Sequence, residues 1–341
     1  MPQNNRAIIY WLVIVCLTIF CMIVVGGVTR LTESGLSMVE WRPLIGIIPP
    51  IGDAEWQAVF SAYQNFPQYQ TVNHTMNIEE FRSIFYWEYG HRVLGRLIGI
   101  IYFVPFLLFL AFKMVPKNMV LKLWIGLVLG GLQGLMGWYM VKSGLVDVPR
   151  VSHYRLAAHL ILALVILCYL TWLILDLLEK RQFDQVPSWF RRLANITFAL
   201  ISLQILYGAF VAGSRAGYGY NTFPLMNGEF MPDAMWQLTP MWLNWLENNT
   251  TLQFVHRWLG TFVLLLSIVL GGFAFRSEDS RFRACGMVVM FTILAQFFLG
   301  VLTLVKVIPI GLASFHQAGA CVVLISILCL VYFSRPLDAK A

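Results

Sequence analysis

The chain has 341 residues, of which 59% are hydrophobic and 12% are charged, and its formal net charge is +7. A mean hydropathy of +0.71 excludes a soluble globular protein and indicates a polytopic membrane protein. The lysines and arginines are spread over several loops and form no single basic stripe, which argues against nucleic-acid binding.

Eight apolar stretches follow one another, each long enough to cross about 30 Å of hydrocarbon. The predicted spans lie at about 8–28, 88–112, 123–141, 156–175, 194–213, 253–275, 286–306 and 313–333. The first span follows Arg6 without a small-residue cleavage site, so we expect an anchored helix and not a removed signal peptide. The sequence therefore predicts an all-α polytopic membrane protein with eight transmembrane helices.

Basic residues indicate how these spans are oriented. Three short loops carry them: Lys113, Lys117 and Lys122; then Lys180, Arg181, Arg191 and Arg192; then Arg276, Arg281 and Arg283. All three loops fall on the side of the N-terminus, which the positive-inside rule assigns to the cytoplasm, or to the matrix in a mitochondrion. The long loops 29–85 and 214–250 are then expected outside.

Two stretches align without gaps, which indicates an internal repeat. Glu88-Tyr-Gly-His91-Arg92-Val-Leu-Gly95 matches Gln253-Phe-Val-His256-Arg257-Trp-Leu-Gly260. Each half contains four spans, so both copies enter the membrane with the same orientation. We expect two pseudo-symmetric four-helix bundles, an N-terminal half 1–175 and a C-terminal half 194–341, joined by a cytoplasmic linker 176–193.

A second repeated element is a Gln-x-x-x-Gly pattern inside the spans. It occurs as Gln133/Gly137, Gln204/Gly208 and Gln296/Gly300. Glycine lets helices approach closely and glutamine hydrogen-bonds across their interface, so helix packing is the first interpretation. Contact with a bound cofactor is the second.

Four histidines lie near the start of alternate spans: His91, His159, His256 and His316. An intramembrane imidazole is expensive and indicates a functional site, and two histidines on facing helices suit a six-coordinate heme iron. Pairing within each half predicts two such sites. Zinc or copper is disfavoured because the region offers no cysteine and little carboxylate. His74 and His153 are not expected to be ligands.

Arginines near these histidines are candidate contacts for heme propionates, which guanidinium groups bind in bidentate fashion. The candidates are Arg92, Arg155 and Arg257. The alternative is snorkelling, or an ion pair between Glu88 and Arg92, which are four residues apart.

The two halves differ chemically at one position. Glu88 lies three residues before His91, where the second half has Gln253 before His256. A carboxylate acts as a base or stabilises a nearby cation, and an amide does neither. The first half is therefore predicted to be the reactive site and the second a permanent electron-transfer heme.

Longer motifs occur in order along the chain. They are Gly26-Gly-Val-Thr-Arg30-Leu-Thr-Glu33-Ser-Gly35-Leu-Ser-Met-Val-Glu-Trp41-Arg-Pro-Leu-Ile-Gly46, Glu88-Tyr-Gly-His91-Arg92, Tyr154-Arg155-Leu-Ala-Ala-His159, Tyr220-Asn-Thr-Phe-Pro224-Leu-Met, Phe254-Val-His256-Arg257 and Phe315-His316-Gln. With the four ordered histidines they resemble, over nearly the whole length, the heme A synthase family, membrane enzymes that convert heme O to heme A for cytochrome oxidase.

The resemblance implies a role for each candidate residue. His256 and His316 would ligate a resident heme b, His91 and His159 would face the substrate heme O, and Glu88 would be the catalytic carboxylate. The first outer loop has no cysteine pair, as in the Gram-negative and mitochondrial subgroup. A bacterial inner membrane is expected, or the mitochondrial inner membrane if the source is eukaryotic. The expected partners are heme O synthase as the supplier of substrate, membrane lipid and an unidentified electron-transfer protein, with homo-oligomer formation left open.

Two other functions fit parts of the sequence. A non-catalytic di-heme cytochrome that exchanges electrons with quinol explains four histidines but leaves the Glu88/Gln253 difference unused. A solute transporter would have broken helices and charges at the membrane midplane, whereas the ionisable groups here cluster at the outer helix ends.

Overall fold

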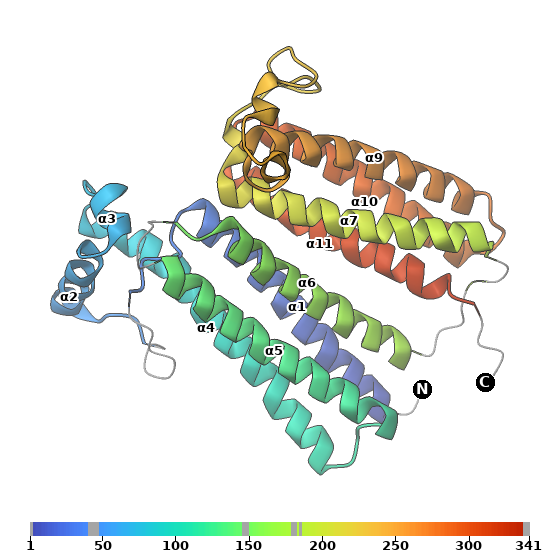
Figure 1. Ribbon diagram of the computed structural model, residues 1–341. Helices are drawn as coiled ribbons and strands as arrows, with labels where there is room; N and C mark the ends of the chain where they lie inside the picture. Colours follow the sequence, from blue (N-terminus) through green and yellow to red (C-terminus); the bar gives the residue numbers. More distant parts are fainter. Residues whose placement is uncertain (1–2, 40–47, 145–149, 179–182, 184–185, 337–341) are drawn as a thin grey trace. The chain divides into compact units, whose positions relative to one another are not determined.

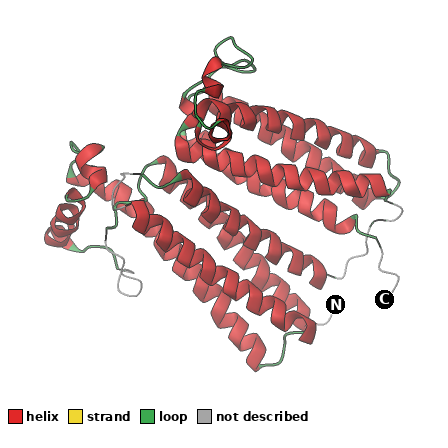
Figure 2. Ribbon diagram, in the orientation of Figure 1, coloured by secondary structure: helices red, strands yellow, loops and turns green. Residues whose placement is uncertain are grey.

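The structure is a computed structural model that describes residues 3–39, 48–144, 150–178, 183 and 186–336. Residues 40–47 of the first-loop motif and two of the predicted cytoplasmic basic residues, Lys180 and Arg181, lie outside the described residues. The described residues form helices and loops and contain no β-strand (Figure 2).

Within the described part of the chain, eight helices are long and apolar enough to span a membrane, which confirms the predicted fold class. They are α1 (Gln3–Leu31), α4 (Ile78–Ala111), α5 (Lys117–Gly144), α6 (His153–Leu177), α7 (Ser188–Ser214), α9 (Asn249–Phe275), α10 (Ser280–Val305) and α11 (Ile310–Phe333) (Figure 1). Shorter helices lie in the two long loops: α2 (Gly52–Gln64), α3 (Pro67–Thr71), η1 (Ala216–Tyr218), η2 (Asp233–Trp236), η3 (Met241–Leu243) and α8 (Asn244–Glu247).

The chain forms two compact units, which we call the first unit (Val13–Ile166) and the second unit (Leu167–Ala341 with Met1–Leu12). The unit boundaries fall inside α1 and α6. The division into halves 1–175 and 194–341 with a linker 176–193 stays a prediction, as does the symmetry between the halves.

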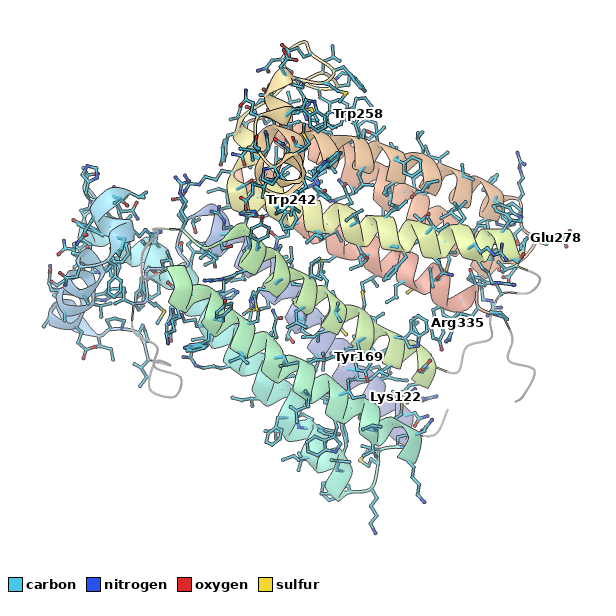
Figure 3. All side chains as sticks on the ribbon, in the orientation of Figure 1. Lys122, Tyr169, Trp242, Trp258, Glu278 and Arg335 are labelled. Atoms are coloured by element: carbon cyan, nitrogen blue, oxygen red, sulfur yellow. The ribbon has the colours of Figure 1, made fainter. Side chains whose placement is uncertain are left out.

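The second unit contains a closed set of four spanning helices. α7 packs against α9 and α11, and α10 packs against the other side of both α9 and α11. Figure 3 shows that Trp242, in the long loop, and Glu278, between α9 and α10, lie at opposite ends of this set. Glu278 is flanked in the chain by the basic residues Arg276, Arg281 and Arg283. The loop that contains Trp242 and the basic loop around Glu278 therefore lie at opposite ends of the unit.

The first unit has an extended α4, which begins at Ile78 and not near residue 88 as predicted. Asn77 starts it with a capping box: its side chain accepts a hydrogen bond from the Glu80 backbone N–H (3.0 Å), and Glu80 accepts one from the Asn77 N–H (3.0 Å). The added turns carry Phe81 and Phe85, which are buried against α2. His91 therefore lies well inside α4, whereas His159, His256 and His316 lie in about the first two turns of their helices.

An aromatic cluster holds the first long loop on the extended part of α4. Its buried members are Trp56, Phe60, Tyr63, Phe81 and Phe85. Tyr63 and Phe81 stack with ring centroids 5.1 Å apart, and burial raises the pKa of the Tyr63 phenol to about 12. This apolar packing, together with the ion pair between Arg82 of α4 and Asp53 of α2 (3.1 Å), holds the loop against the N-terminal part of α4.

Topology is testable with single cysteines. Lys113→Cys in the loop between α4 and α5 should be inaccessible to a membrane-impermeant maleimide in whole cells, whereas Asn227→Cys, in the exposed part of loop 214–250, should be labelled. Labelling of both after the membrane is permeabilised is the control. Labelling of Lys113→Cys in intact cells would contradict the orientation.

Candidate functional site

His256 of α9 and His316 of α11 face each other in the second unit. Their ring centroids are 6.4 Å apart and the ring planes are nearly perpendicular, at 87°. Metal–imidazole nitrogen bonds are about 2 Å long, and the ring centre lies about 1 Å beyond, so two imidazoles on one metal ion have centroids about 6 Å apart. The spacing observed here fits two axial ligands of one iron.

Each of these rings lies against a glycine of a neighbouring helix. A Cβ added to Gly208 of α7 would lie 3.0 Å from Cε1 of His256, and one added to Gly300 of α10 would lie 2.7 Å from Cε1 of His316. Any larger residue would push the ring away, because packed interiors leave no room for an extra methyl group.

The first unit repeats this contact. A Cβ on Gly137 of α5 would lie 3.1 Å from Cε1 of His159, and one on Gly26 of α1 would lie 3.1 Å from Nε2 of His91. His91 of α4 and His159 of α6 belong to the same compact unit. All four candidate histidines thus lie over a glycine, which explains the glycines of the Gln-x-x-x-Gly elements.

The glutamines of these elements hold the histidine helices. The Nε2 atoms of Gln133, Gln204 and Gln296 donate to the backbone carbonyls of His159 (3.1 Å), His256 (2.8 Å) and His316 (2.7 Å). Gln133 and Gln296 also lie 3.3 and 3.1 Å from Nδ1 of their histidine rings. The sequence interpretation put helix packing first; the structure adds direct contact with the candidate ligands.

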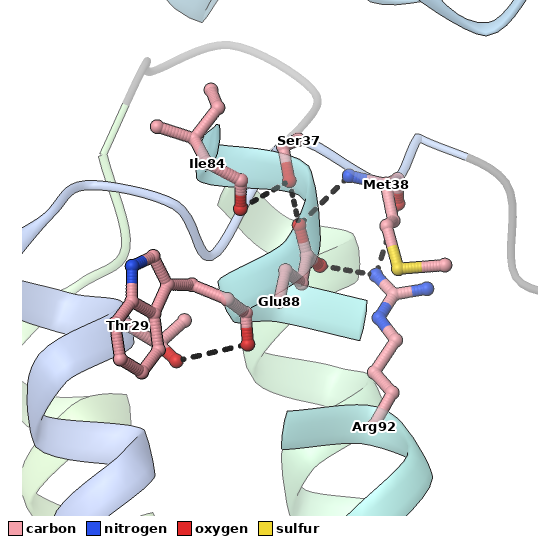
Figure 4. Close-up of polar contacts among 7 residues, drawn as sticks. Thr29, Ser37, Met38, Ile84, Glu88 and Arg92 are labelled. Atoms are coloured by element: carbon pink, nitrogen blue, oxygen red, sulfur yellow. Dashed lines mark hydrogen bonds and ion pairs between the residues drawn. The ribbon is translucent and has the colours of Figure 1, made fainter. Parts of the chain in front are cut away.

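Glu88 is almost completely buried, with 2% of its surface exposed. Its Oε2 accepts hydrogen bonds from Ser37 Oγ (2.8 Å) and the Met38 backbone N–H (2.7 Å), and its Oε1 pairs with Arg92 at 2.5 Å (Figure 4). Arg92 also donates to the Met38 carbonyl (2.9 Å). The predicted Glu88–Arg92 ion pair is therefore present, and it fastens the segment after α1 to α4.

Gln253 makes the opposite kind of contact in the second unit. Its Nε2 donates to the carbonyls of Tyr220 (3.1 Å) and Gly217 (3.3 Å). The neighbouring Arg257 donates to the carbonyls of Tyr220 and Thr222, both at 2.6 Å. The second long loop therefore presents hydrogen-bond acceptors to Gln253, whereas the segment after α1 presents donors to Glu88. This reversal could not be predicted from the residue pattern, because it depends on which backbone groups the loops turn inward.

The three candidate propionate ligands all have protein partners. Arg92 and Arg257 make the loop contacts described above, and the Arg155 guanidinium lies 4.5 Å from the ring centre of Tyr139. Propionate binding by these arginines stays a prediction.

The two remaining histidines lie apart from these pairs. His74 is exposed between α3 and α4, and the His153 ring packs on Tyr154 with centroids 4.0 Å apart. Within the described part of the chain, no group of three or more histidines, cysteines and acidic residues has the geometry to hold a metal ion.

The eight described spanning helices define a polytopic membrane protein, and paired imidazoles on facing helices are an arrangement by which such proteins ligate heme. The COX15-CtaA model of cytochrome oxidase assembly proteins matches residues 9–328, and the chain belongs to this family.

Several curated relatives support this assignment. Heme A synthase of Nitrosospira multiformis is 48% identical over 321 residues, which cover 93% of this chain and 90% of that protein. Heme A synthase of Parvibaculum lavamentivorans is 47% identical, over 94% of this chain and 92% of that protein. Heme A synthase of Rhodospirillum centenum is 41% identical, over 98% and 91%.

The histidine–glycine contacts lead to a prediction for the second unit. Gly300→Ala and Gly208→Ala should displace the imidazoles of His316 and His256 and weaken heme binding about 10–100-fold, the usual effect of disturbing the surroundings of a metal ligand, so that the purified protein retains less heme. Gly272→Ala in α9 is the matched control, because a Cβ there meets nothing within 4 Å. Normal heme content in Gly300→Ala, measured by pyridine hemochrome, would contradict the assignment.

Proposed function

We propose that this protein is a heme A synthase of the bacterial inner membrane that oxidises a ring methyl of heme O to the formyl group of heme A for cytochrome oxidase assembly. Family membership and relatives of that name support the activity. The observation that carries the proposal is local: each of the four histidines lies against a glycine, but among the described residues only the first pair has a buried carboxylate, Glu88, three residues from a histidine.

In this proposal His256 and His316 hold a resident heme b. Their 6.4 Å spacing, the glycines beneath them and the glutamines that anchor their helices support this role. The closed packing of α7, α9, α10 and α11 suits a group that is retained. When bound, heme b supplies one-electron transfer.

His91 and His159 hold the substrate heme O in the first unit. The described spanning helices of this unit approach one another less closely, backbone to backbone, than those of the second unit do. Looser packing suits a ligand that must enter and leave. Gly26 and Gly137 make room for the two rings at the same time.

Glu88 acts on the methyl carbon in this proposal. Two successive oxidations convert the methyl group to a hydroxymethyl group and then to a formyl group. Positive charge that develops at the methyl carbon is delocalised into the porphyrin ring, and the Glu88 carboxylate stabilises it and takes the proton of the attacking water. The hydrogen bonds from Ser37, Met38 and Arg92 fix the carboxylate in one place without the need for reorganisation.

The reaction needs one partner that supplies heme O and another that accepts electrons. Heme O must come from a heme O synthase reaction, and the electrons must leave to an acceptor in or near the membrane.

Expression in a host that makes heme O but no heme A tests the activity: heme A should appear in pigment extracts. Two protein-bound hemes without heme A would favour the di-heme cytochrome.

Glu88→Gln tests the catalytic role. The substitution gives the first unit the amide that the second unit has, with almost no change in volume. We expect heme O, or its hydroxymethyl derivative, to accumulate, with heme A formation about 10²–10⁴-fold lower, which is the usual effect of losing a positioned base. Chromatography of extracted hemes measures it.

Ser37→Ala is the control for the loop contact of Glu88. It removes one of the hydrogen bonds to Oε2 but leaves the carboxylate and its pair with Arg92 in place. Heme A formation should fall less than in Glu88→Gln, because the carboxylate that acts as the base remains, with its hydrogen bond from Met38 and its pair with Arg92. Equal loss in both variants would mean that Glu88 serves only to fasten the loop.

A further inference from the structure

The four candidate histidines are not held equally. His159, His256 and His316 each have a glutamine of a neighbouring helix bonded to their own backbone carbonyl. In each case that glutamine lies four residues before the glycine beneath the ring. The amide and the glycine act together: one anchors the helix at the ligand residue, and the other makes room for its ring.

The helix next to His91 keeps the glycine and lacks the amide. Gly26 of α1 lies under the His91 ring, and the residue four positions earlier is Met22. A thioether has no N–H group, so Met22 cannot donate to the His91 carbonyl or to its ring. Among the described residues, no side chain or backbone group forms a hydrogen bond with the His91 ring.

Met22 occupies the position that Gln204 has in the second unit. A Cβ on Gly95, four residues after His91, would lie 3.3 Å from Cε of Met22. A Cβ on Gly260, four residues after His256, would lie 2.9 Å from Nε2 of Gln204. The two side chains therefore reach the same point on equivalent helices, and the difference between them is chemical and not positional.

The His91 ring also presents a different edge to its glycine. Gly137, Gly208 and Gly300 each face Cε1 of their histidine, whereas Gly26 faces Nε2 and Cδ2 of His91 (3.1 and 3.4 Å from an added Cβ). The three histidines with a glutamine share one ring orientation, and His91 does not. This second observation is independent of the hydrogen-bond pattern.

We propose that Met22 makes His91 the exchangeable ligand of the substrate heme, while Gln133 makes His159 the permanent one. This inference rests on the proposed function. An iron with two axial imidazoles has no free position; breaking the bond to His91, with the electron pair left on the imidazole nitrogen, opens one without transfer of a proton or an electron. Met22 is a positioning residue that acts through His91.

Carbon monoxide binding to the dithionite-reduced protein loaded with heme O measures this release, because the gas enters only after a histidine has left. Met22→Gln should slow carbon monoxide binding about 10–100-fold, the usual effect of an outer partner on a metal ligand. Met22→Leu, which is of similar size and also lacks a donor, should keep the wild-type rate. An unchanged rate in Met22→Gln would overturn the proposal.

A second pair of variants does not depend on α1. His91→Gly should keep heme O bound through His159 in a form that binds carbon monoxide at once, whereas His159→Gly should lose heme O. The reverse result would make His159 the exchangeable ligand. A wild-type protein that holds no second heme when heme O is supplied would instead contradict the proposed function; a second heme with equal rates in wild type and Met22→Gln contradicts this inference alone.

Discussion

The close contact between an imidazole and the backbone of the next helix is the constraint on which the two sites depend. A histidine inside an apolar span needs both space and polar partners, and at these positions a Cβ on the neighbouring helix would lie only about 3 Å from the ring. Gly26, Gly137, Gly208 and Gly300 supply that space. The helix registers of both units follow from it, because each glycine must face its own histidine.

Both units place a glycine beneath each candidate histidine, but they differ in the other residues around the histidines. The second unit has an amide at each relevant position, Gln204, Gln253 and Gln296, and every one of them donates to a backbone carbonyl. The first unit has Glu88 and Met22 where the second has Gln253 and Gln204. One change places a carboxylate three residues before His91, and the other removes a hydrogen-bond donor from the helix that faces it. Both suit a site where a substrate reacts and leaves.

Much of this arrangement could be predicted from the sequence, because apolar length fixes the spans and the histidines recur with the repeat. The N-terminal extension of α4 was not predicted, because the apolar stretch used to place the span begins only near residue 88. Asn77 and Glu80 have the spacing of a capping box and could have indicated the earlier start. The contact between Gln296 and His316 could not be predicted, because it depends on the register between helices. The tie from Glu88 to Ser37 and Met38 depends on the path of a loop, for which no periodic pattern exists.

The central claim is that the histidine pairs have unequal roles, one for a retained group and one for a substrate. Heme content of purified alanine variants tests it most directly. His256→Ala and His316→Ala should remove the heme that co-purifies with the protein, whereas His91→Ala and His159→Ala should retain most of it and form no heme A. Equal loss of the co-purifying heme from all four variants would contradict the account and favour a simple di-heme cytochrome.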